Sequence, residues 1–141
     1  HYRLPGEFEE CVLDVLGALS FLKGVGAMRV VLVGHSFGGA VAIRAGLLAP
    51  IVSAVAAMSS QLYGAREVAE LSPRPLLLVH GMDDQVLEAT ASETIYDWAE
   101  EPKRLVLYAG AGHSLSQCQA ELYDLLTGWI PEHAVSSEEA S

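Results

Sequence analysis

Four short apolar runs recur along the chain, and longer stretches with a helical pattern separate them. The runs cover residues 29–33, 51–58, 75–79 and 103–108. Bulky and β-branched side chains without polar alternation are typical of strands that are buried on both faces of a parallel sheet. The intervening connections are long enough to hold helices, which favours parallel strands joined by right-handed crossovers.

The intervening stretches predict helices, because apolar residues recur there every three or four positions. The predicted helices span residues 7–23, 37–49, 91–100 and 116–130. We expect Thr90 to cap the third helix and Pro131 to end the fourth. Residues 59–72 are expected to form a short irregular or helical connection. The apolar stripe of the first helix is expected to consist of Phe8, Val12, Val15, Leu19 and Leu22.

These elements predict one α/β domain over residues 1–131, an open parallel sheet with helices on both faces. A content of 51% hydrophobic and 18% charged residues in 141 is typical of a single soluble globular domain. Residues 132–141 are acidic and rich in serine, with almost no large apolar side chains. We therefore expect them to form a disordered tail.

Charge and composition exclude several classes of partner and site. The formal net charge of −10 argues against nucleic acid or an anionic membrane surface as a partner, because both require a basic patch. No apolar run approaches the ~20 residues of a membrane span, and the first residues do not resemble a signal peptide. Cys11 and Cys118 lie in helical patterns, which predicts free thiols and a cytoplasmic location. The histidine and glycine spacings predict neither a metal site nor a dinucleotide site.

The first apolar run ends abruptly in the pentapeptide Gly34-His35-Ser36-Phe37-Gly38. In the spacing G-x-S-x-G, a strand turns at once into a helix and holds the serine in a strained conformation above the sheet edge. Side chains at either glycine position are expected to collide across so tight a turn. The alternative is a glycine-rich turn that contains a serine without a chemical role.

Two further strand ends carry groups that could activate such a serine. Asp84 follows the third predicted strand and His113 follows the fourth. Since ligands bind at the carboxyl ends of parallel strands, Ser36, Asp84 and His113 are expected to meet at one edge. Imidazole can take a hydroxyl proton near neutral pH, and a carboxylate can fix its tautomer. For His35 and His80 we expect packing or turn hydrogen bonds rather than catalysis.

Three motifs in this order resemble the α/β-hydrolase superfamily, with features of its dienelactone-hydrolase-like and lidless esterase branches. The motifs are GHSFGG at 34–39, HGMDDQV at 80–86 and GAGHS at 110–114, and the resemblance covers about residues 7–130. It implies the C-terminal half of that fold, without its N-terminal strands. By this resemblance Ser36 is the nucleophile, His113 the general base and then acid, Asp84 (rather than Asp83) the orienting carboxylate, and the Phe37 amide an oxyanion-hole donor.

The resemblance implies a serine hydrolase that cleaves small carboxylic esters through an acyl-enzyme, with no cofactor. An acyltransferase or peptidase using the same residues, and a non-catalytic binding or scaffold module, remain alternatives. Nothing before residue 7 resembles the loop that supplies the second oxyanion donor in this superfamily. The strand at 29–33 would also be an apolar edge, so we expect a preceding segment or a second copy to pair there. The connection 59–72 is too short for a lid domain, which favours small soluble substrates.

Overall fold

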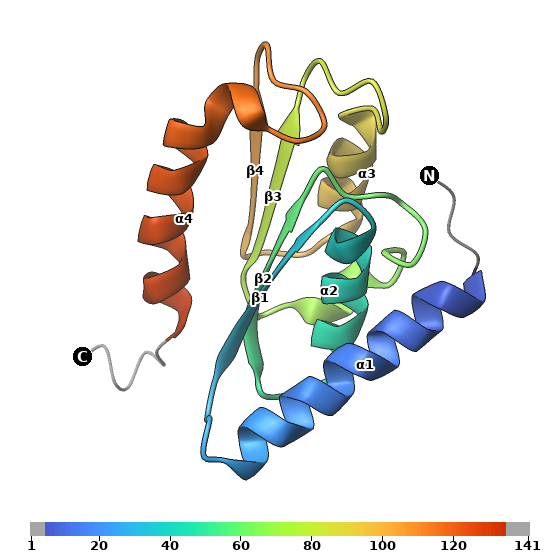
Figure 1. The fold of residues 1–141 in the computed structure, drawn as a ribbon, viewed down its shortest axis with the longest axis vertical. Coiled ribbons are helices and arrows are strands. Elements are labelled where there is room, and N and C mark those ends of the chain that lie inside the picture. Colours follow the sequence, from blue (N-terminus) through green and yellow to red (C-terminus); the bar gives the residue numbers. More distant parts are fainter. Residues whose placement is uncertain (1–4, 135–141) are drawn as a thin grey trace.

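The computed structural model describes residues 5–134 (Figure 1). Its helices are α1 (Pro5–Gly24), α2 (Phe37–Leu48), α3 (Thr90–Trp98) and α4 (Gln119–Ala134), with short 3-10 helices η1 (Val68–Leu71) and η2 (Ser116–Cys118). Its strands are β1 (Val30–His35), β2 (Val52–Met58), β3 (Leu76–Gly81) and β4 (Lys103–Tyr108). Each predicted strand and helix is present, with bounds within a few residues of those expected.

The four strands form one parallel sheet in the order β1-β2-β3-β4. Strands that are neighbours in sequence are therefore neighbours in the sheet. All four carboxyl ends lie at the same edge of the sheet, at the top of Figure 1. This confirms the predicted fold class and gives one edge at which side chains from distant parts of the chain can meet.

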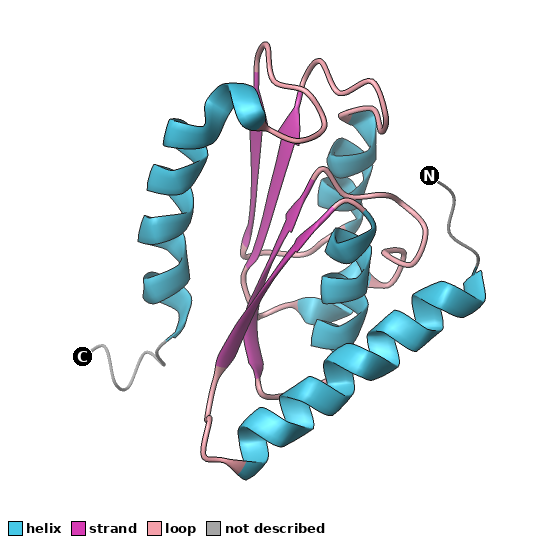
Figure 2. Cartoon of the chain, in the orientation of Figure 1, coloured by secondary structure: helices cyan, strands magenta, loops and turns pink. Residues whose placement is uncertain are grey.

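Helices cover both faces of the sheet (Figure 2). On one face lie α2 and α3, with α1 packed against α2, and on the other lies α4. The core between the sheet and α1–α3 includes Ile43, Val55, Leu71, Leu78 and Ile95. The core beneath α4 includes Ala54, Ala56, Leu77, Val79, Leu115 and Trp129. Inward-facing side chains alternate between the two faces along the central strands, as the pleat of a strand dictates.

The first strand is less buried than its apolar sequence predicts. Val33 is 41% exposed, whereas Val55 and Leu77 on the central strands are fully buried. Within residues 5–134, β1 pairs only with β2, so its other edge carries no neighbouring strand. The expectation of a strand buried on both faces is therefore wrong for β1. The predicted stripe of α1 also ends early, because Leu22 is 38% exposed.

Two predicted helix boundaries are wrong. Thr90 does not cap α3: it is the first helical residue, and Ala89 stands at the cap position. Pro131 does not end α4, which continues to Ala134.

Tertiary contacts explain why α4 continues beyond its proline, which removes one intrahelical hydrogen bond. The ring of His133 packs against the buried Trp129 ring with centroids 4.8 Å apart. The carbonyl of His133 accepts a hydrogen bond from the Ser53 hydroxyl at 2.8 Å. The expected tail at 132–141 thus begins in helix, and residues 135–141 lie outside the described residues.

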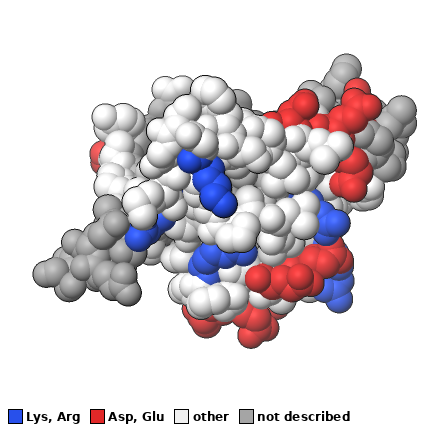
Figure 3. Space-filling view, turned by 90° about the horizontal axis from the view of Figure 1, so that it is seen from below, with Lys and Arg blue, Asp and Glu red and all other residues white. Residues whose placement is uncertain are grey.

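The surface opposite the strand carboxyl ends is seen from below in Figure 3. Acidic side chains gather in separate groups near its margins, with Lys and Arg between them, and much of the face carries neither sign of charge. Among the helices of residues 5–134, none combines the length and the apolar character that crossing a membrane requires.

Candidate active site

The turn from β1 into α2 places Ser36 above the sheet edge. Ser36 has φ 59° and ψ −120°, in the region that residues with a side chain rarely adopt. Its amide donates to the carbonyl of Met58 at 2.7 Å, which holds the turn against the end of β2. The strained conformation is the one that the pentapeptide predicts.

The two glycines of the pentapeptide have different roles. A Cβ at Gly34 would collide with the carbonyl of Gly38, so no larger residue fits at position 34 without a shift of backbone. A Cβ at Gly38 would meet no atom within 4 Å. The expectation that both positions are closed to side chains is therefore wrong for Gly38.

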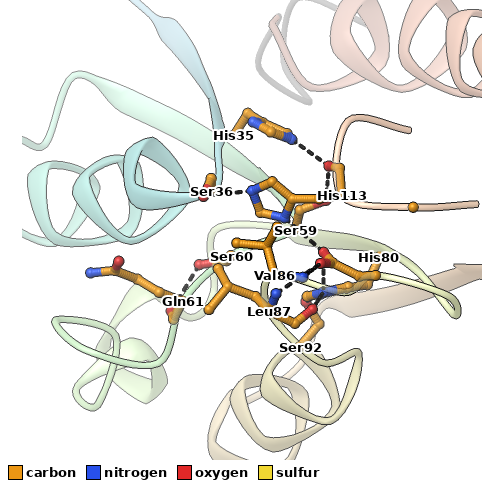
Figure 4. Close-up of polar contacts among 12 residues, drawn as sticks. His35, Ser36, Ser59, Ser60, Gln61, His80, Val86, Leu87, Ser92 and His113 are labelled. Carbon is orange, nitrogen blue, oxygen red and sulfur yellow. Dashed lines mark hydrogen bonds and ion pairs between the residues drawn. The ribbon is translucent and has the colours of Figure 1, made fainter. Parts of the chain in front are cut away.

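The three predicted side chains form a continuous hydrogen-bonded chain (Figure 4). His113 Nε2 lies 2.9 Å from Ser36 Oγ, and His113 Nδ1 lies 2.8 Å from Asp84 Oδ2. A carboxylate only accepts, so Nδ1 carries the proton, and Nε2 of the neutral ring accepts from the serine hydroxyl. The side chain of Asp84 is fully buried, while that of His113 is 21% exposed. Ser36, like His113, is half-buried.

Backbone amides hold the Asp84 carboxylate. Its Oδ1 accepts from the amides of Val86 at 2.8 Å and Leu87 at 2.7 Å. Burial by itself raises the pKa of Asp84, but the hydrogen bonds from Leu87, His113 and Val86 together hold the pKa below its ordinary value. Asp84 is therefore an anion at neutral pH. The neighbouring Asp83 is exposed, so the structure places Asp84 rather than Asp83 against the histidine.

Close packing of two loops brings Asp84 to His113. The loop after β3 donates through the amides of Met82 and Asp83 to the carbonyls of Tyr108 and Ala111, both at 2.9 Å. A Cβ at Gly81 would collide with the carbonyl of Ala111. Glycine is therefore required at position 81 for this approach.

Ser59, for which the sequence predicts no role, and His35, for which it predicts packing or a turn hydrogen bond, hold the backbone of His113. Its carbonyl accepts from Ser59 Oγ at 2.9 Å and from His35 Nε2 at 2.7 Å. Ser59 is fully buried and has φ 49°. Its position directly after β2, at the same edge as the other strand ends, was the signal in the sequence that could have identified it.

A comparison with known families identifies the family of this chain. The sequence profile of a family described as phospholipase/carboxylesterase matches residues 14–127. The chain belongs to this family. Acyl-protein thioesterase 1 of Neurospora crassa is 33% identical to this chain over 133 residues, and the match covers 84% of this chain and 54% of that protein. The chain spans about half or less of the length of the curated relatives that it matches.

Solved structures support the same fold. The esterase domain of a Rhodothermus marinus protein is 23% identical, with a TM-score of 0.77, and the match covers 88% of this chain and 69% of that chain. Dienelactone hydrolase from Anabaena variabilis is 22% identical, with a TM-score of 0.77, and the match covers 88% of this chain and 60% of that chain. At these identities the likeness concerns the fold, and it confirms the predicted α/β-hydrolase fold.

A hollow of about 660 Å³ lies between α1, α2 and the loop that precedes η1. The ring of Phe8, one of its lining residues, packs edge-on against Phe37 with centroids 5.8 Å apart, and Phe37 directly follows Ser36. The ring of Tyr63 also packs edge-on against that of Phe8, with centroids 5.4 Å apart. The hollow is lined by Phe8, Glu9, Arg44, Leu62, Tyr63, Gly64, Arg66 and Glu67.

Within the described part of the chain, no group of His, Cys, Asp and Glu side chains is arranged to hold a metal ion.

Proposed function

We propose that the protein is a serine hydrolase that cleaves small carboxylic esters through an acyl-enzyme on Ser36. The observation that carries this proposal is the continuous hydrogen-bonded chain from Ser36 through His113 to Asp84. Membership of the phospholipase/carboxylesterase family supports the reaction class.

Each residue has a role that follows from its hydrogen bonds. His113 Nε2 takes the proton of the Ser36 hydroxyl as its oxygen attacks the ester carbonyl, and the buried Asp84 stabilises the imidazolium that forms. The same Nε2–H then protonates the departing alcohol, which leaves an acyl group on Ser36. Water, deprotonated by His113, attacks the acyl carbon and releases the acid, which restores the serine hydroxyl.

The developing negative charge requires donors near the carbonyl oxygen of the substrate. The amide of Phe37 stands at the N-terminus of α2, where the helix dipole favours negative charge. We propose it as one oxyanion donor. A second donor is expected from a segment outside this chain.

A thioester is a second candidate substrate, favoured by the similarity to a fungal acyl-protein thioesterase over 84% of the chain. The same nucleophile and base can cleave both bonds, so substrate preference depends on the groups that line the site. An acyltransferase or peptidase would transfer or cleave with the same three residues, and a scaffold module would show no turnover.

The test compares the complete protein with its Ser36→Ala variant on p-nitrophenyl acetate and on a short acyl thioester. We expect Ser36→Ala to lower kcat by about 10³-fold or more, and a fluorophosphonate probe to label the wild type alone. The exposed Ser20→Ala variant is the control and should behave as wild type. Undiminished turnover in Ser36→Ala would remove the mechanism, and absence of labelling in the wild type would favour a scaffold.

A further inference from the structure

A second histidine lies fully buried beneath Asp84. His80, near the end of β3, has no exposed surface, and both of its ring nitrogens have hydrogen-bond partners. Its Nε2 lies 2.8 Å from the carbonyl of Leu87 and 3.1 Å from Asp84 Oδ2. Its Nδ1 lies 2.6 Å from the hydroxyl of Ser92 on α3, which is also fully buried (Figure 4).

The partners of His80 determine which nitrogen carries the proton. A carbonyl oxygen only accepts, so Nε2 must carry the hydrogen that faces Leu87. Asp84 Oδ2 lies 3.1 Å from the same nitrogen. In the neutral ring Nδ1 then accepts, and the Ser92 hydroxyl donates to it. The Leu87 carbonyl therefore fixes the tautomer of His80, and the Ser92 hydroxyl holds the ring in place at its other nitrogen.

Asp84 is linked to His80 by two routes. Directly, Oδ2, the oxygen bonded to His113 Nδ1, lies 3.1 Å from His80 Nε2, whose hydrogen bond goes to the Leu87 carbonyl. Oδ1 accepts from the amide of Leu87, whose own carbonyl accepts from His80. The peptide of Leu87 and the His80 ring together restrict both rotation and displacement of the carboxylate.

We propose that His80 and Ser92 are positioning residues that hold the Asp84 carboxylate in the orientation His113 requires. This inference rests on the proposed function, because it assigns His80 a role in the same reaction. His80 touches neither Ser36 nor the expected substrate position, so it acts through Asp84 alone. The expected signature is a loss in kcat with little change in KM.

A matched pair of variants tests the role of the His80 Nε2 donor. His80→Gln can place an amide N–H close to the position of Nε2, whereas the shorter His80→Asn reaches only the position of Nδ1. We expect His80→Asn to lower kcat by about 10- to 100-fold while KM changes little, and His80→Gln to restore most of the loss. His133→Asn, at the far end of α4, is the control histidine and should keep the wild-type kcat. Equal kcat values for His80→Gln and His80→Asn would overturn the proposal.

A spectroscopic readout separates this inference from the proposed function. The His113 Nδ1–H, assigned by its loss in His113→Gln, gives a downfield proton signal that does not require turnover. We expect this signal in the wild type and in His80→Gln, and a shifted or broadened signal in His80→Asn. A wild type with no esterase activity but with this response would overturn the proposed function and retain the positioning role.

Ser92→Ala covers the case in which His80→Asn does not fold, since it removes only the donor to Nδ1. A decrease in kcat together with a change in the His113 signal is expected. Wild-type kcat and an unchanged signal in folded Ser92→Ala would overturn the proposal.

Discussion

At the scale of the residue, the site depends on a few positions whose backbone or electrostatic environment is unusual. Ser36 and Ser59 both have positive φ, at 59° and 49°, and both stand where a parallel strand ends. Conformations of this kind cost about 1–3 kcal/mol each and persist where surrounding contacts hold them. Here the amide of Ser36 is bonded to Met58 and the amide of Ser59 to Val79.

The two glycines of the elbow provide a matched test of local sterics. We expect Gly34→Ala to lower the free energy of unfolding by about 1–3 kcal/mol and to abolish fluorophosphonate labelling, because its Cβ collides with the Gly38 carbonyl. We expect Gly38→Ala to leave stability unchanged or raise it by up to about 1 kcal/mol, since alanine is favoured in a helix and the space is open. Urea unfolding measures both. Equal losses in the two variants would contradict this account.

Asp84 predicts a defined pH dependence of stability. Its pKa in the folded protein lies below the ordinary value of 3.8, so its carboxylate stabilises the fold fully above that pH. This contribution is lost as the pH falls through the folded-state value. We expect the difference in unfolding free energy between wild type and Asp84→Asn to be largest near neutral pH and to shrink below about pH 3.8. Urea unfolding at a series of pH values measures it, with the exposed Asp83→Asn as control. A difference that is constant from neutral to acidic pH would show that the carboxylate charge is not its source.

At the scale of the element, the C-terminal end of α2 is held by a side chain from a distant part of the chain. Arg74 Nη1 donates to the carbonyls of Gly46 at 2.7 Å, Val52 at 3.0 Å and Ala49 at 3.3 Å. Burial lowers the pKa of this guanidinium from its ordinary value. A cation at this end also complements the helix dipole. Because α2 carries Ser36 at its other end, this contact helps to fix the helix on which the nucleophile stands.

We therefore expect Arg74→Met to lower the free energy of unfolding by about 2–3 kcal/mol, since three carbonyls lose a charged donor. Arg44→Met is the matched control. Its ion pair with Glu67 is long, at 3.4 Å, and exposed, so we expect a loss below about 1 kcal/mol. Thermal or urea unfolding compares the two variants. A loss for Arg44→Met as large as that for Arg74→Met would contradict the capping role.

At the scale of the whole molecule, one edge of the sheet carries more apolar surface than an edge strand usually presents. Within residues 5–134, β1 has a strand neighbour on one side alone, and Val33 is 41% exposed. Further exposed apolar side chains lie on α1 and just after it, among them Phe21, Val25 and Met28. The chain also spans about half or less of the length of its curated relatives. We propose that a preceding segment of the complete protein, or a second copy, pairs with β1.

Hydrogen exchange tests this pairing. In the complete protein we expect slow exchange at the β1 amides that do not bond to β2, because an added strand would accept from them. The amides on the outer edge of β4 provide the internal comparison and should exchange faster. Protection that disappears on dilution would indicate a second copy, and protection independent of concentration a segment of the same chain. Rapid exchange at both edges would contradict the proposal.

Local sequence determined much of this architecture. The apolar runs fixed the four strands, because buried parallel strands need continuous bulky side chains. The pentapeptide around Ser36 fixed the elbow, since the tight turn needs Gly34. Asp84 and His113 could be placed at strand ends from sequence, and parallel strands bring their ends to one edge.

Only the tertiary structure decided how these groups are held. Whether α4 passes Pro131 depends on two contacts of His133. Its ring packs against Trp129, and its carbonyl accepts a hydrogen bond from Ser53, which is remote in the sequence. The contact of Ser59 with His113 joins the loops that follow β2 and β4, and the contact of His80 with Ser92 joins β3 to α3. A sequence pattern determines periodicity and local turn geometry, because these depend on neighbouring residues. Hydrogen bonds between distant loops depend on how the sheet brings the loops together, so the tertiary structure alone decides them.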